Sequence, residues 1–89
     1  MKEATTIKLK EPIPFGSEAV TELRLRPPKA KDFRRLPMEP SIGDMLDFAG
    51  QLAGQPKVVM DELGVEDFAE VMTLANSFVP GGRATGQTP

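Results

Sequence analysis

Hydrophobic and polar residues alternate near the start of the chain, over residues 5–12. Ile7 and Leu9 fall on one face of this segment. Lys8 and Lys10 fall on the other. A period of two is typical of a strand with one buried face. We therefore expect a β-strand here, with its apolar side turned toward a core.

A second segment, residues 19–26, repeats the alternation, and its apolar face is formed by Thr21, Leu23 and Leu25. The intervening PIPFGSE contains two prolines and a glycine, which interrupt a strand ladder and predict a loop. The two segments together predict a β-hairpin over residues 5–26. An isolated hairpin is only marginally stable in water, so the rest of the chain or another subunit must cover its apolar face.

The pattern changes to helical spacing between residues 28 and 79. Pro28 suits the first turn of a short helix. Ser41, with Asp44 three residues later, is typical of the capping box that begins a longer helix. A further short helical segment follows this helix, and a last helix is expected from about residue 65 to residue 78.

Residues 1–79 are expected to form a single small domain of the α+β class: an N-terminal β-hairpin followed by a small bundle of three or four helices. The hairpin would occupy residues 5–26 and the helices residues 28–79. Residues 80–89 read PGGRATGQTP, which is polar and rich in Gly and Pro. Such a segment cannot bury apolar surface, and we expect it to be a disordered C-terminal tail.

The last helix carries an apolar stripe formed by Phe68, Val71, Met72, Ala75, Phe78 and Val79. Leu74 lies off this stripe, and Phe48 lies off the stripe of the longer helix before it. Such residues widen the apolar arc and indicate either a second packing contact or a partner surface. Methionine adapts to core and partner surfaces alike. The candidate partner-binding residues are Phe48, Leu74, Phe78, Val79, Met72 and Met45.

The composition argues against an enzyme. The 89 residues include no Cys and no His, which removes thiolate metal sites and the commonest general base. The glycine-containing segments FGS and GGRATG lack phosphate-loop spacing. Acids such as Glu66 and Asp67 fall on predicted helix starts and solvated faces, where the helix dipole favours them. We therefore expect no catalytic residue, no metal site and no cofactor.

No apolar run approaches the roughly 18 residues of a membrane span, and the first residues lack an apolar signal core. This predicts a cytoplasmic protein without a membrane partner. The net charge of −2 is unevenly distributed. Residues 1–36 carry nine Lys/Arg and five Asp/Glu, whereas residues 37–79 carry one Lys and eight acids.

A basic half can indicate a small nucleic-acid-binding or regulatory module. Its candidate cations are Arg24, Arg26, Lys29, Lys31, Arg34 and Arg35. The acidic total and the scarcity of aromatic residues for base stacking disfavour nucleic acid. The interpretation we favour is that the two halves attract each other or bind surfaces of opposite charge on partners.

The segments TIKLKEPI, AVTELRLRPPKAKDFRRL and VVMDELGVEDFAEVMTLANSFV, with a capped helix ending in LAGQP, resemble a known family. It is the family of small tail assembly chaperones of Mu-like contractile-tailed phages. The resemblance covers about residues 5–80. The positions that carry it are Leu9, Pro12, Ile13, Leu23, Leu25, Arg26, Pro28, Asp32, Leu63, Asp67 and Phe78.

The resemblance implies a non-enzymatic protein that coats the long, hydrophobic, helical tape measure protein while tail tube subunits polymerise around it. Such chaperones are absent from the finished particle. Many exist in two lengths through a programmed ribosomal frameshift, and the extension recruits the tail tube protein. Coating by many copies implies a homo-oligomer, in which the charge-split halves can meet head to tail. A permanent structural tail subunit is the remaining alternative.

Overall fold

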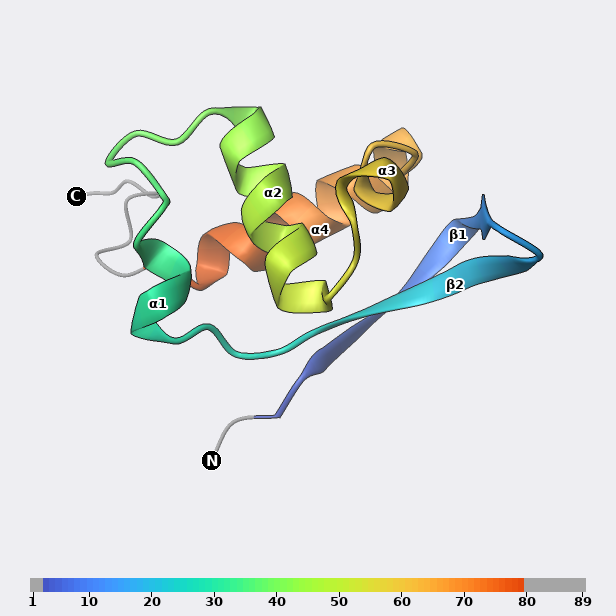
Figure 1. Ribbon diagram of the computed structural model, residues 1–89, viewed down its shortest axis with the longest axis horizontal. Coiled ribbons are helices and arrows are strands. Elements are labelled where there is room, and N and C mark those ends of the chain that lie inside the picture. Colours follow the sequence, from blue (N-terminus) through green and yellow to red (C-terminus); the bar gives the residue numbers. More distant parts are fainter. Residues whose placement is uncertain (1–2, 80–89) are drawn as a thin grey trace.

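The computed structural model describes residues 3–79, which form a two-stranded antiparallel hairpin followed by four helices (Figure 1). The predicted α+β class is confirmed. The elements are β1 (Thr5–Phe15), β2 (Glu18–Leu25), α1 (Ala30–Phe33), α2 (Ile42–Ala53), α3 (Lys57–Met60) and α4 (Val65–Ser77). The C-terminal tail predicted at residues 80–89 lies outside the described residues.

The two strands meet in a turn of two residues, Gly16 and Ser17, and not in the longer loop predicted from PIPFGSE. Gly16 has a φ of 66° and Ser17 has no positive φ, the pattern of a type II′ hairpin turn. Strand β1 continues through Pro12 and Pro14. Prolines are tolerated there because each strand of a two-stranded sheet has a free edge, where a missing N–H breaks no ladder bond.

Strand β1 bulges between Lys8 and Ile13. Lys8 pairs with Glu22, and Ile13 pairs with Val20. Four residues of β1 therefore lie opposite the single residue Thr21 of β2. A bulge bends its strand and increases the local twist. As a consequence Thr21, which was predicted to face the core, is exposed, and Val20 packs against the core instead.

Helix α2 begins at the capping box that its sequence predicts. The Ser41 hydroxyl accepts a hydrogen bond from the N–H of Asp44 at 3.0 Å, and the Asp44 carboxylate accepts one from the N–H of Ser41 at 2.9 Å. This reciprocal pair is a capping box, and it satisfies two backbone donors at the start of the helix. Gly54 ends the helix in the left-handed conformation, with a φ of 68°.

One hydrophobic core lies between the hairpin and the helices. The hairpin contributes Ile7, Leu9, Ile13, Leu23 and Leu25. The helices contribute Met45, Phe48, Ala49, Leu52, Val59, Met60, Val71 and Ala75. The apolar face of the hairpin is therefore covered by the helices of its own chain, which answers the stability requirement of a lone hairpin.

Candidate functional site: the groove between β1 and α4

Two carboxylates are buried in the described part of the chain, those of Asp32 and Asp67. A buried charge is destabilising unless hydrogen bonds or an ion pair compensate for its lost hydration. Both residues belong to the positions that carry the resemblance to the chaperone family. Their contacts determine how the hairpin sits on the helices.

Asp67 fastens the start of α4 to the bulge of β1. The N–H of Lys10 donates to its two carboxylate oxygens at 2.9 and 3.0 Å, and the N–H of Glu11 donates at 3.1 Å. These bonds satisfy backbone donors that the bulge removes from the strand ladder. The N–H of Lys10 lowers the pKa of Asp67, outweighing the opposite effect of burial. The carboxylate therefore stays ionised and holds helix against strand.

Asp32 joins the end of the hairpin to α1 and α2. The guanidinium of Arg26 donates to the two carboxylate oxygens at 2.8 and 2.9 Å. The N–H of Lys29, at 2.7 Å, and the side-chain amide of Gln51 also donate to this carboxylate. The Arg26 guanidinium holds the pKa of Asp32 well below its usual range, although burial opposes the shift.

A groove of about 380 Å³ lies between the first half of β1 and the second half of α4. It is lined by Thr5, Thr6, Ile7, Glu70, Thr73, Leu74 and Ser77. The Asp67 carboxylate ties α4 to β1 one helical turn before this stretch begins, so the groove opens only beyond that tie. Among the lining residues Leu74 is half-buried and Ile7 is buried, and the others carry hydroxyl groups or, in Glu70, a carboxylate. Such a surface suits the apolar side of a protein segment.

The structure separates the six predicted partner-binding residues into two groups. Leu74 is half-buried and lines the groove. Met72, Phe78 and Val79 are half-buried and pack against the core from α4 and its end. Phe48 and Met45 of α2 are buried within the core. The four residues of α4 and its end therefore keep exposed surface, whereas the two residues of α2 keep almost none.

The position of Phe48 has a simple packing explanation. Its ring lies 5.4 Å, between centroids, from the ring of Phe33, with an interplanar angle of 39°. Helix α2 contacts α4, β2 and α3, and α1 packs on it as well. A helix covered on several sides needs a wider apolar arc than one stripe. Of the two interpretations of Phe48, second packing contact or partner surface, the structure therefore shows the packing contact.

Sequence reasoning missed most of the groove and the role of Asp67. Thr5, Thr6 and Glu70 carry no pattern of their own, and they form a groove only because β1 and α4 lie side by side. Asp67 was expected at a solvated helix start, yet it is buried. Its position among the residues that carry the family resemblance was the one available signal of a structural role.

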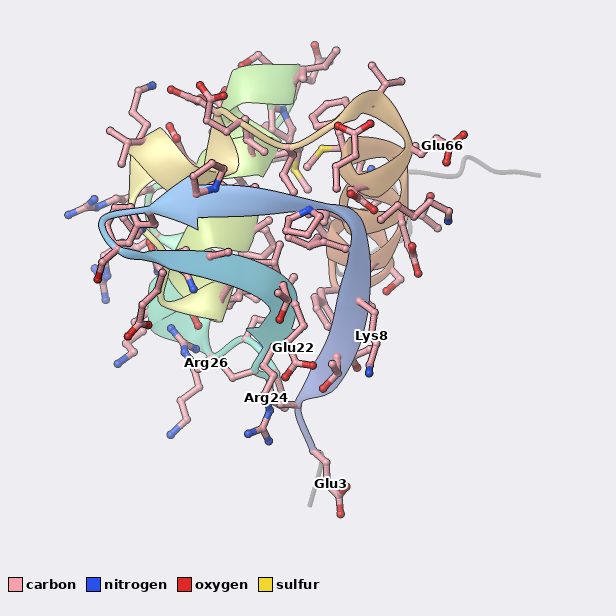
Figure 2. All side chains as sticks on the ribbon, turned by 90° about the vertical axis from the view of Figure 1, so that its right-hand side faces the viewer. Glu3, Lys8, Glu22, Arg24, Arg26 and Glu66 are labelled. Carbon is pink, nitrogen blue, oxygen red and sulfur yellow. The ribbon has the colours of Figure 1, made fainter. Side chains whose placement is uncertain are left out.

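Some of the basic residues considered for nucleic-acid binding lie beside acidic side chains of the same chain. Arg26 is paired with Asp32, at 2.8 Å between Nη1 and Oδ2. On the hairpin, Lys8 lies opposite Glu22, and Figure 2 shows these two side chains close to Arg24 on one side of the sheet. Mixed charges of this kind weaken the electrostatic attraction that phosphate binding requires.

Within residues 3–79 no three side chains of the metal-binding types gather to hold an ion. Over the same range no helix has the length and apolar character that crossing a bilayer requires. What the described part of the chain offers is a hairpin fastened to a helical body by two buried carboxylates, with an open groove beside α4. This arrangement is an α+β fold with one open groove described at its surface.

A comparison with protein families agrees with this description. The family model described as "Phage tail assembly chaperone proteins, E, or 41 or 14" matches residues 6–80. The chain therefore belongs to the phage tail assembly chaperone family, and the resemblance inferred from its sequence is confirmed. The matched range includes both buried carboxylates and the whole groove except Thr5. No curated protein and no solved structure matches the chain.

Proposed function

We propose that this protein is a non-enzymatic chaperone that binds the tape measure protein through the groove between β1 and α4. Family membership supports a role in tail assembly. The groove supports the choice of surface, because it offers the half-buried Leu74 in an open trough beside an exposed strand. Binding there would cover apolar side chains of the tape measure protein and keep it soluble.

The physical demands of this role fit a shallow site. An amphipathic helix in a groove is recognised through apolar residues one turn apart, and a groove of about 380 Å³ holds few of them. Each contact is therefore weak. Several copies along one rod give a tight complex, because every additional contact is intramolecular once the first has formed. Phe78 and Val79, which are half-buried and pack against the core, lie just beyond the end of α4.

The experiment that tests the site is co-expression with the tape measure protein of the same phage. Thr73→Glu places a charge in the groove on an exposed residue, so the fold should be retained. Ala69→Glu is the matched control, because it places the same charge on an exposed position of α4 outside the groove. We expect the control to co-purify soluble tape measure protein and Thr73→Glu to lose it. Equal recovery with both variants would refute the groove as the site.

A second readout addresses the role itself. If the unmodified protein leaves the tape measure protein insoluble and co-purifies none of it, the chaperone function fails whatever the variants do. An assembly factor should act in the host cytoplasm and be missing from purified virions by mass spectrometry. Its presence there in stoichiometric amount would favour a permanent structural subunit instead. Recruitment of the tail tube protein through a frameshifted extension is the further part of this proposal, and a longer product in infected cells would support it.

A further inference from the structure

The polar side chains on the α4 wall of the groove are hydrogen-bond acceptors. The wall consists of Glu70, Thr73, Leu74 and Ser77. The hydroxyl of Thr73 donates to the carbonyl of Ala69 at 3.0 Å. The hydroxyl of Ser77 donates to the carbonyl of Leu74 at 2.6 Å. A hydroxyl has one hydrogen, so both oxygens can only accept a further bond, as the ionised carboxylate of Glu70 does.

The same wall is negatively charged. Glu70 is exposed and is the one charged residue that lines the groove. Among residues 3–79 the ion pair formed is that of Arg26 with Asp32, so Glu70 has no basic partner in this range. The C-terminal end of a helix carries partial negative charge, and the last turn of α4 contains no basic residue that would offset it. The groove therefore attracts a positively charged hydrogen-bond donor.

Leu74 adds an apolar contact one helical turn from this charge. It is half-buried and lies four residues after Glu70, which corresponds to about 6 Å along the axis of α4. A partner helix packed along α4 would present an apolar residue to Leu74 and a residue three or four positions away to Glu70. Lysine and arginine suit the second position, because their apolar stems can lie along the groove while their charged heads reach the carboxylate.

We propose that the groove selects a partner segment in which a lysine or arginine lies one helical turn from an apolar residue, and that Glu70 recognises the cation. This inference rests on the proposed function and specifies the partner as a basic amphipathic stretch of the tape measure protein. An exposed ion pair contributes little to affinity, so its main effect is to select which stretch binds, and in which register. Acidic stretches are disfavoured, since their carboxylates would meet Glu70.

The test is a titration of the full chain with three synthetic peptides, followed by two-dimensional NMR of the groove residues. Each peptide is alanine-rich, about 16 residues long so that it can form a helix, and carries two leucines one turn apart on one face. The first has a lysine one turn from the leucines on the same face. The second has the lysine on the opposite face, with the same composition. The third has a glutamate in place of the lysine of the first.

We expect the signals of Thr73 and Leu74 to shift with the first peptide. Its affinity should exceed that of the second about two- to fivefold at about 50 mM salt. This preference should vanish in Glu70→Gln, and in Glu70→Lys the third peptide should bind best. The control is Glu66→Gln, which neutralises an exposed acid one turn earlier on α4, outside the groove, and should keep the preference. Figure 2 shows the side chain of Glu66 extending away from the body.

Several outcomes would overturn the inference. They include equal affinities for the first and second peptides, a preference that survives Glu70→Gln, and the absence of any shift of the groove residues with all three peptides. Shifts of the same signals on dilution of the protein alone would assign the groove to a second copy of the chain. Shifts on removal of residues 80–89 would assign it to the chain's own C-terminal residues, and either result would overturn the inference as well.

Co-expression separates this inference from the proposed function. If the tape measure protein co-purifies with the wild-type protein but the peptides show no preference, the inference alone fails. If the wild-type protein recovers no tape measure protein, the proposed function fails, and the peptide titration still decides whether the groove prefers a basic segment.

Discussion

Replacing Asp32 by Ala tests the idea that buried carboxylates hold the hairpin to the helices. The substitution removes a bidentate ion pair with Arg26 and leaves the N–H of Lys29 and the amide of Gln51 without their acceptor. Breaking a buried ion pair destabilises by about 3–5 kcal/mol. The Arg26 side chain is 40% exposed and regains water, so we expect a smaller loss, about 2–3 kcal/mol.

This loss is large for so small a domain. At about 0.05–0.15 kcal/mol per residue, a chain of this size has a free energy of unfolding of roughly 4–12 kcal/mol. A loss of about 2–3 kcal/mol should lower the Tm by about 10–20 °C. The assay is thermal unfolding followed by circular dichroism at pH 7. The control is Asp47→Ala, an exposed acid on α2, which should change the Tm little. A Tm for Asp32→Ala within about 2 °C of this control would refute the reasoning.

The same variant predicts a pH dependence. The folded pKa of Asp32 lies below its unfolded value, so the stability that it contributes is present above the unfolded pKa of about 3.9. That stability is lost as the pH falls toward the folded pKa. The difference in Tm between the wild-type protein and Asp32→Ala should therefore be full at pH 7 and shrink below about pH 4. A difference that stays constant down to pH 2 would contradict the assignment.

Two further predictions concern the hydrogen bonds between Asp67 and β1, and the packing of the core. Asp67→Asn should lower the Tm more than Glu66→Gln, because of these two acids only Asp67 accepts hydrogen bonds from the β1 bulge. The folded pKa of Asp67 is lowered, so the stability that its carboxylate contributes is lost as the pH falls. The difference in Tm between the wild-type protein and Asp67→Asn should therefore narrow below about pH 4. Gly50→Ala should destabilise by about 1–2 kcal/mol in urea denaturation, because its Cβ would lie 2.9 Å from Cγ of Met60. Gly43→Ala, on the same helix, would place its Cβ 3.8 Å from Oγ of Ser41, an ordinary van der Waals contact, and should be neutral or slightly stabilising. Equal effects of the two substitutions would contradict the packing argument.

Elements whose formation depends on neighbours in sequence were predictable. The capping box of Ser41 and Asp44, the left-handed Gly54 and the alternation of Ile7 and Leu9 each follow from local physics, and each is present. The bulge of β1 was not predictable, because its donors are satisfied by Asp67, more than fifty residues away. No local pattern reveals such a bond, and the two prolines of β1 favoured a loop.

In the candidate site, too, residues marked by a local pattern were predictable, and residues that depend on distant contacts were not. Leu74 stood out because it lies off the stripe of its own helix, a local signal. Phe48 gave the same signal for a different reason, since Phe33 covers it from α1. Periodicity shows that an apolar arc is wide, but it does not show whether the chain itself supplies the second cover. The rest of the groove depends on the relative placement of β1 and α4.

The 45 Å length of the molecule has a consequence for stoichiometry. If copies coat a helical tape measure protein with this axis along the rod, each covers about that length of it. A helix rises 1.5 Å per residue, so roughly 30 residues of a helical partner pass each copy. The number of chaperones bound would then increase in proportion to the length of the tape measure protein. A tape shortened by about 60 residues should bind two copies fewer, a difference that native mass spectrometry can count.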